Sequence, residues 1–241
     1  MGTDGSRTFA LFTATILMVM ALFASSLLGD FEERDPMFGD LEYVALGDSI
    51  TYGFDGDTGM RMASPYPCLV AKKLGVGSHT NLAVSGATVS NINRYNNTML
   101  QFADVPESAD IISVMIGVND FSVCAPLGQM GDMTQDTIYG GLYMLAASLQ
   151  DRCPDAVIFF MTPFQFPGYP GENPAGYTLS DVADAVKVVC LDRGIPVLDM
   201  YTYGGFSMES DPCCDTLHPT QAFFRKYTAP MVSEFIRSLY G

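Results

Sequence analysis

From residue 41 onward the chain alternates short apolar runs with longer segments whose apolar residues recur at helical spacing. The short runs are rich in Val, Ile, Phe and Met and do not alternate with polar residues. This pattern is typical of strands buried on both faces of a parallel sheet. The predicted strands span residues 43–47, 79–86, 110–117, 156–163 and 195–201.

The segments between and after these runs predict helices. Asp136 stands where the third helix needs a cap, Ser180 or Asp181 where the fourth does, and Gly194 provides a stop for the fourth. Strict alternation of strands and helices predicts an α/β fold, a three-layer α/β/α sandwich with a five-stranded parallel, flavodoxin-like sheet. The predicted helices span residues 66–75, 91–103, 136–153, 180–194 and 220–240.

The N-terminal region differs in composition from the rest of the chain. Between Arg7 and Asp30 there is no charged residue, and the apolar run at 8–28 ends near small residues that suit peptidase cleavage. Residues 1–29 are therefore a signal peptide or an N-terminal membrane anchor, since a run of about 20 residues can also span a bilayer. Residues 30–40 are interpreted as a linker, and residues 41–241 as one domain. Whether residues 1–29 are a signal peptide or an anchor, we expect a secreted or extracytoplasmic protein. It would contact a membrane only through a retained anchor.

Charge and cysteine content narrow the classes of partner. The chain of 241 residues has 12 Lys and Arg against 27 Asp and Glu, a formal net charge of −15. Such a surface repels phosphate backbones, so nucleic acid is not an expected partner. The six cysteines fit an exported chain, and a bridge from Cys124 to Cys213 or Cys214 is one hypothesis. Ligand spacings typical of metals are missing from the sequence, so neither a metal nor a cofactor is expected.

Polar residues that can catalyse acyl transfer follow several predicted strands. Ser49 follows the first strand, and Asp215 and His218 follow the fifth, so all three fall at the carboxyl edge of the sheet, where ligands bind in such folds. A serine becomes nucleophilic when a histidine takes its proton and a carboxylate orients that histidine. The other histidine, His79, precedes the second strand and is expected to be structural.

Acyl transfer also needs hydrogen-bond donors for the oxyanion of the tetrahedral intermediate. Three donors are available at the same edge: the N–H of Ser49, the N–H of Gly86 in "AVSGAT", and the side-chain amide of Asn119 in "IGVND". Each of these motifs, taken alone, is also an ordinary turn or helix entry. Their joint position at several strand ends favours a catalytic site.

In this order the motifs "GDSIT", "NLAVSG", "GVND" and "DTLHP" resemble those of the SGNH hydrolases, also called the GDSL esterase/lipase family. The resemblance covers about residues 41–240. It implies that Ser49 is nucleophile and oxyanion donor, that Gly86 and Asn119 are the other donors, and that His218 is the base that Asp215 orients. Ile50 replaces the family's leucine, a change between apolar residues.

The substrate is less well defined by the sequence. A loop at 162–177, rich in Pro, Gly and aromatic residues, leaves the catalytic edge, so Phe164, Phe166, Tyr169 and Tyr177 are candidates to line a substrate pocket. We expect an esterase acting on short-chain carboxylic esters, such as O-acetyl groups on carbohydrate. The alternatives are a lipid hydrolase of the lysophospholipase or thioesterase type and a non-catalytic surface binding domain.

Overall fold

The computed structural model describes residues 36–209, 211 and 215–241. The predicted signal peptide or anchor at 1–29 and linker residues 30–35 lie outside these ranges, as do Cys213 and Cys214. Within them, no helix is both long enough and apolar enough to cross a membrane.

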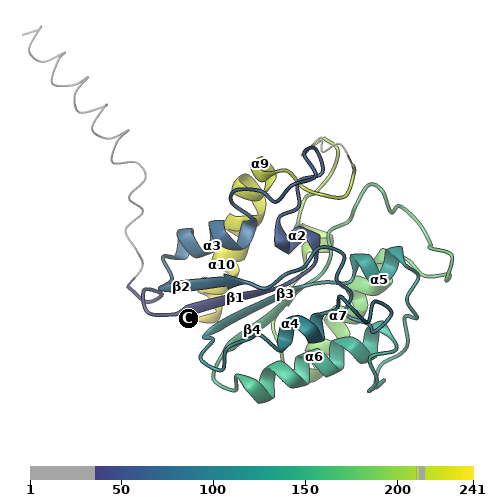
Figure 1. Ribbon diagram of the computed structural model, residues 1–241, viewed down its shortest axis with the longest axis horizontal. Coiled ribbons are helices and arrows are strands. Elements are labelled where there is room, and N and C mark those ends of the chain that lie inside the picture. Colours follow the sequence, from purple (N-terminus) through teal and green to yellow (C-terminus); the bar gives the residue numbers. More distant parts are fainter. Residues whose placement is uncertain (1–35, 210, 212–214) are drawn as a thin grey trace, which may run out of the picture. The chain divides into compact units, whose positions relative to one another are not determined.

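One parallel sheet of five strands forms the centre of the domain (Figure 1). Its order is β2-β1-β3-β4-β5, and every neighbouring pair is parallel. This is the flavodoxin-like order, which confirms the predicted fold class. The strands are β1 (Glu42–Gly47), β2 (Ser78–Asn81), β3 (Ile111–Met115), β4 (Val157–Met161) and β5 (Val197–Leu198).

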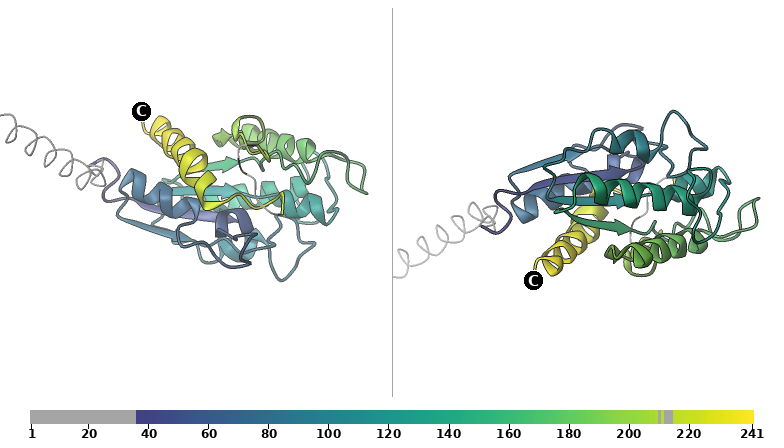
Figure 2. Two further views of the ribbon diagram at one scale, coloured as in Figure 1. Left: turned by 90° about the horizontal axis from the view of Figure 1, so that it is seen from above. Right: turned by 90° about the horizontal axis from the view of Figure 1, so that it is seen from below.

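Helices cover both faces of the sheet, as Figures 1 and 2 show. Helices α3 (Tyr66–Leu74) and α10 (Ala229–Leu239) pack together on one face, where Phe235 contacts Phe159 of β4. The other face carries α4, α6 and α7. Right-handed crossovers between parallel strands produce this division. The three helices on that second face are α4 (Thr98–Phe102), α6 (Ile138–Arg152) and α7 (Leu179–Arg193).

Several predicted boundaries were wrong. The second strand ends at Asn81 instead of residue 86. The helix predicted at 91–103 is confined to α4, because the side chain of Asn97 accepts hydrogen bonds from the backbone N–H of Met99 and Leu100 and starts the helix there. Thr137 and Thr178, instead of the predicted acidic or serine residues, cap α6 and α7, while Gly194 ends α7 as expected. The final helix is divided into α9 (Gln221–Phe223), a π-helical turn η1 (Phe224–Thr228) and α10.

Candidate active site

The first strand ends in a backbone geometry that only glycine accommodates well. Gly47 has φ +155°, and a Cβ placed on it would lie 2.4 Å from Oγ1 of Thr51. The buried side chain of Gln101 accepts from the Gly47 N–H at 2.9 Å and donates to the Gly47 carbonyl at 2.8 Å. The chain can therefore turn from β1 into helix α2 (Ser49–Tyr52) while the backbone N–H and C=O of its last strand residue, Gly47, both stay hydrogen-bonded.

Asp48 caps α2 and is buried. Its Oδ1 accepts from the Ile50 N–H at 2.9 Å, a bond to the local backbone. Burial raises the pKa of this carboxyl to about 7, and the nearby Asp120 carboxylate raises it further, against the lowering effect of the Ile50 N–H. The residue before the candidate nucleophile is thus an acid that titrates near neutrality.

Ser49, His218 and Asp215 form a continuous row of hydrogen bonds. Oγ of Ser49 lies 2.9 Å from Nε2 of His218, and Nδ1 of His218 lies 2.5 Å from Oδ2 of Asp215. The second carboxylate oxygen, Oδ1, accepts from the backbone N–H of Leu217 and His218, which folds residues 215–218 into a tight turn. The structure therefore brings together the three residues that the sequence singled out, across 169 positions between Ser49 and His218.

The carboxylate of Asp215 is held in its charged form. Partial burial acts to raise the pKa of Asp215, but hydrogen bonds from the His218 ring and from the His218 and Leu217 N–H groups outweigh it, so the pKa lies below its ordinary value. An ionised Asp215 fixes Nδ1 of His218 as a proton donor and leaves Nε2 to accept from the serine.

The predicted oxyanion donors lie in the segments that follow β1, β2 and β3. Ser49 opens α2, where the first backbone N–H groups of a helix have no intrahelical acceptor. Gly86 has φ +80° in the loop after β2, and Asn119 is the second residue of α5 (Val118–Ser122). One N–H of the Asn119 amide donates to the Ala87 carbonyl at 3.0 Å, which orients the amide and leaves its other N–H available.

Asp120, next to Asn119, ties two of these loops together. Its buried carboxylate accepts from the backbone N–H of Val89 and of Ser90, each at 2.9 Å, and from the Ser90 hydroxyl at 2.6 Å. Burial raises the pKa of Asp120 to about 6, although these hydrogen bonds lower it. The loop that carries Gly86 is consequently anchored on the helix that carries Asn119.

Three of the four aromatic residues predicted to line a substrate pocket are buried in the structure. Phe164 and Phe166 are buried, and both rings pack against Phe206 in an aromatic cluster. Tyr177 is also buried, and its hydroxyl donates to the Ala125 carbonyl at 2.7 Å. Tyr169 lines a cavity of about 230 Å³ together with Phe121 and residues 170–174, and the lining of this cavity includes neither Ser49 nor His218.

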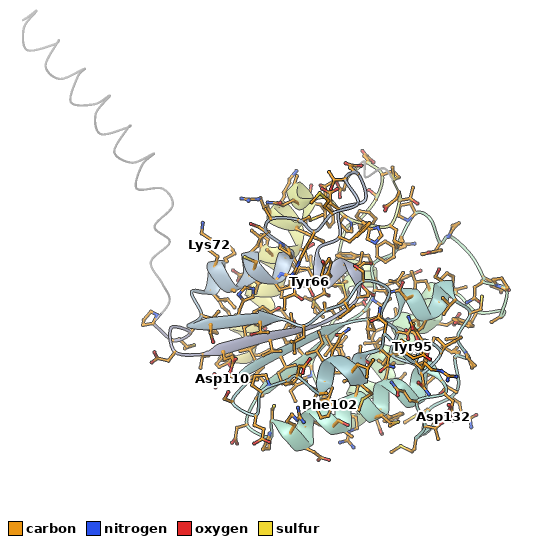
Figure 3. The ribbon with its side chains drawn as sticks, viewed as in Figure 1. Tyr66, Lys72, Tyr95, Phe102, Asp110 and Asp132 are labelled. Carbon is orange, nitrogen blue, oxygen red and sulfur yellow. The ribbon has the colours of Figure 1, made fainter. Side chains whose placement is uncertain are left out.

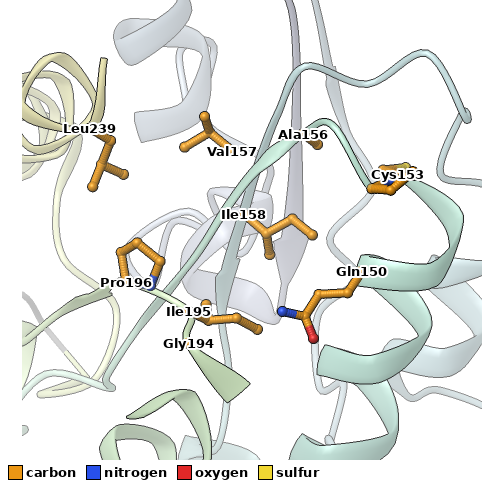
Figure 4. A pocket seen from close by; sticks show the side chains of 10 residues that line it. Gln150, Cys153, Ala156, Val157, Ile158, Gly194, Ile195, Pro196 and Leu239 are labelled. Atoms are coloured by element: carbon orange, nitrogen blue, oxygen red, sulfur yellow. The ribbon is translucent and has the colours of Figure 1, made fainter. Parts of the chain in front are cut away.

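Another cavity of the described residues is lined by residues far from Ser49 in the fold. Figure 4 shows this cavity, of about 290 Å³, between the start of β4 and the end of α10, lined mostly by apolar side chains such as Val157 and Ile195. That is the amino edge of the sheet, the edge where Figure 3 places Asp110, whereas Tyr95 lies among the loops of the opposite edge. His79, in β2, is half-buried, and burial together with Arg61 lowers its pKa; it takes no part in the row of hydrogen bonds formed by Ser49.

Some residues that organise the site were not predicted. Gln101 could have been noticed as a polar side chain between apolar neighbours in a short helix, and Asp120 as an acid in the short helix that follows a buried strand. Cys68, Cys153 and Cys190 carry free thiols, whereas the hypothesised bridge from Cys124 would end at Cys213 or Cys214, which lie outside the described residues.

A flavodoxin-like sheet that presents a serine hydroxyl, an imidazole and a carboxylate at its carboxyl edge is the construction of an ester hydrolase. The sequence model of the GDSL-like Lipase/Acylhydrolase family matches residues 45–226. The chain therefore belongs to this family, and it is a carboxylic ester hydrolase.

Solved structures with the same fold are numerous. A protein from Lactobacillus plantarum is 32% identical, with a TM-score of 0.72, and the match covers 83% of this chain and 98% of that one. A carbohydrate acetylesterase from Sinorhizobium meliloti is 16% identical, with a TM-score of 0.61 over 83% of this chain and 100% of that one. A phospholipase A1 from Streptomyces albidoflavus is 20% identical, with a TM-score of 0.57 over 81% and 99%. A comparison with curated protein sequences finds no significant match.

Proposed function

We propose that the chain is an exported serine esterase that hydrolyses short-chain carboxylic esters through a Ser49–His218–Asp215 triad. The observation that carries this proposal is the row of hydrogen bonds from Oγ of Ser49 through both ring nitrogens of His218 to Asp215. A serine in such a row can transfer its proton as it attacks a carbonyl carbon.

The proposed reaction has two halves. Ser49 attacks the ester carbonyl while Nε2 of His218 takes its proton, and the oxyanion that forms accepts hydrogen bonds from the N–H groups of Ser49 and Gly86 and from the Asn119 amide. His218 then gives the proton to the leaving alcohol, which leaves an acyl-enzyme. Water, activated by the same imidazole, releases the acid and restores the serine.

Ser49→Ala tests the nucleophile with an accessible ester such as p-nitrophenyl acetate. We expect kcat to fall by on the order of 10³-fold or more, because no other group replaces the serine oxygen. Ser108→Ala is a matched control, since Ser108 is an exposed serine that bonds to Glu42 near the start of β1, and it should retain full activity. Equal activity of the Ser49→Ala variant and the unmodified protein would refute the catalytic role.

We propose short acyl groups, such as acetyl groups on carbohydrate, as the substrate class. The net charge of −15 disfavours approach to anionic lipid surfaces, which supports a small or carbohydrate ester. Comparing p-nitrophenyl acetate with p-nitrophenyl palmitate measures this preference, and acetyl xylan or another acetylated polysaccharide tests the carbohydrate. A higher kcat/KM for the palmitate ester would contradict the proposal.

Lipid hydrolysis of the lysophospholipase or thioesterase type is the second candidate. It is favoured by two exposed apolar side chains, Val84 and Val123, which are 46% and 51% exposed and lie within a few residues of Gly86 and Asn119. Apolar side chains at this edge could contact a longer acyl chain. The same pair of esters decides between the two candidates.

Export is proposed from the apolar N-terminal run alone. In a secreting host, we expect the domain outside the cytoplasm, either released after cleavage near residues 24–29 or held by residues 8–28. Fractionation followed by N-terminal mass spectrometry distinguishes the two, and an intact chain found only in the cytoplasm would contradict both.

A further inference from the structure

A hairpin continues directly from the helix that carries Ser49. Gly53 ends α2 in a left-handed conformation (φ +85°), and the N–H of Phe54 donates to the carbonyl of Ser49 itself at 2.9 Å. Phe54 then pairs with Arg61, while the N–H of Met62 returns to the Gly53 carbonyl at 2.7 Å. The base of this hairpin is therefore bonded to the backbone of the nucleophile itself.

The same hairpin contacts the other two members of the row. The Phe54 ring packs against the imidazole of His218, with 4.6 Å between ring centroids and 56° between ring planes. Two residues further along, the backbone of Gly56 approaches the carboxylate of Asp215 so closely that a Cβ there would lie 2.4 Å from Oδ2. Phe54 therefore touches Ser49 through its backbone and His218 through its side chain.

A contact of this kind matters because nothing local sets the distance between Ser49 and His218. The two residues are 169 positions apart. His218 lies in a turn of a loop, and its side chain is 12% exposed. A histidine side chain rotates about two bonds, and a misplacement of about 1 Å in a catalytic group can cost about 100-fold in rate. An aromatic ring against one side of the imidazole restricts that rotation and keeps water from it.

The chemistry of the ring adds a second contribution. When His218 takes the proton of Ser49 it becomes an imidazolium, and the negative π face of a nearby aromatic ring attracts that charge more than an aliphatic group does. The contact between Phe54 and His218 is thus available in the resting enzyme and gains in strength as the charge develops.

We propose that Phe54 is a positioning residue, which holds the imidazole of His218 in line with Ser49 through the hairpin that both residues contact. Gly56 is the position that lets the hairpin lie against Asp215 without displacing its carboxylate. This inference rests on the proposed function of Ser49, His218 and Asp215.

The test compares Phe54→Ala, Phe54→Leu and Phe54→Tyr in the full-length chain with p-nitrophenyl acetate. We expect Phe54→Ala to lower kcat by about 10- to 100-fold with KM within about twofold, because the ring acts on the imidazole and not on bound substrate. Phe54→Leu should lose less, and Phe54→Tyr, which keeps the ring, should retain kcat within about threefold. Met60→Ala, at an exposed residue of the same hairpin, is the control and should leave kcat unchanged.

Titration with a fluorophosphonate counts reactive sites, so each kcat refers only to folded enzyme. If Phe54→Ala does not fold, the comparison of Phe54→Leu with Phe54→Tyr carries the test. A kcat that stays unchanged in Phe54→Ala or Phe54→Leu refutes the proposal, and so does a rise in KM at constant kcat, which would make Phe54 a substrate contact. If instead Ser49→Ala is as active as the unmodified protein, the proposed function itself has failed, a result distinguishable from the loss of this inference alone.

Discussion

Replacing Asp48 with Asn should make the folded protein more stable at high pH and leave it almost unchanged at low pH. The side chain of Asp48 is buried, and burial is the largest cause of its pKa of about 7, compared with 3.8 for an ordinary aspartate. Asn has a side-chain oxygen in the same place, so it can still accept from the Ile50 N–H and cap α2. The substitution therefore removes the ionisation and keeps the structural bond.

The magnitude follows from linkage between protonation and folding. A rise from 3.8 to about 7 is roughly three pH units, and each is worth about 1.4 kcal/mol, so the ionised carboxyl costs the folded state about 4 kcal/mol. Because the folded pKa lies above the unfolded one, the folded state binds more protons between about pH 4 and pH 7, and stability falls as the pH rises through that window. Asp48→Asn has no such loss, so its advantage should grow from near zero at pH 4 to about 2–4 kcal/mol at pH 8.

Urea unfolding of both proteins at pH 4.5, 6 and 8 measures this advantage as a difference in the free energy of unfolding. Asp104→Asn, at an exposed aspartate, is the matched control and should change stability by less than about 0.5 kcal/mol at each pH. A difference between Asp48→Asn and the unmodified protein that stays constant from pH 4.5 to pH 8 would show that Asp48 does not carry this buried ionisation.

Three further substitutions probe the catalytic edge and its support. Asp215→Asn should lower kcat by on the order of 10³- to 10⁴-fold in steady-state ester hydrolysis, because Asn does not hold Nδ1 of His218 as a donor; a loss below tenfold would contradict that role. Asn119→Ala should lower kcat by about 10²- to 10³-fold with KM little changed, and a loss seen only in KM would remove it from the oxyanion donors. Gly47→Ala should destabilise the fold by about 2–4 kcal/mol in urea unfolding, since its Cβ would press on Thr51, and an unchanged midpoint would refute this requirement for glycine.

The central part of the fold could be predicted because its strands are short, continuously apolar and separated by helical patterns. The five strands and their parallel arrangement follow from that alternation. Strand ends were less well predicted. Residues 82–84 are apolar and still donate to β1, through the N–H of Leu82 and Val84 to Ala45 and Gly47, but they lie past the end of β2. Hydrophobicity alone does not distinguish such a one-sided extension from the strand itself.

The positions of the site residues could be predicted because parallel strands bring their carboxyl ends to one edge. Ser49, Asp215 and His218 were assigned from that rule and from their chemistry, and their atoms lie within hydrogen-bonding distance in the structure. The contacts that support them could not be predicted in the same way. Phe54 and Gln101 act through tertiary contacts with His218 and Gly47, and no local pattern in the sequence indicates either partner.

The aromatic loop at 162–177 illustrates a further limit. Its composition indicates a loop near the site, but composition does not tell which rings face a substrate and which face the core. Phe164 and Phe166 are buried because Phe206, from a segment about 40 residues further along, completes their cluster. That neighbour is set by the tertiary fold, so the composition of the loop alone does not indicate that both rings are buried.

The central claim is that Ser49 is an activated nucleophile, and covalent labelling tests it most directly. A fluorophosphonate reacts with a serine whose proton is taken by a neighbouring base, and peptide mapping by mass spectrometry then identifies the modified residue. We predict one modified peptide, containing Ser49, together with loss of esterase activity in proportion to labelling, and no labelling of the Ser49→Ala variant. Labelling at another serine, or full esterase activity with Ser49 unmodified, would contradict the account.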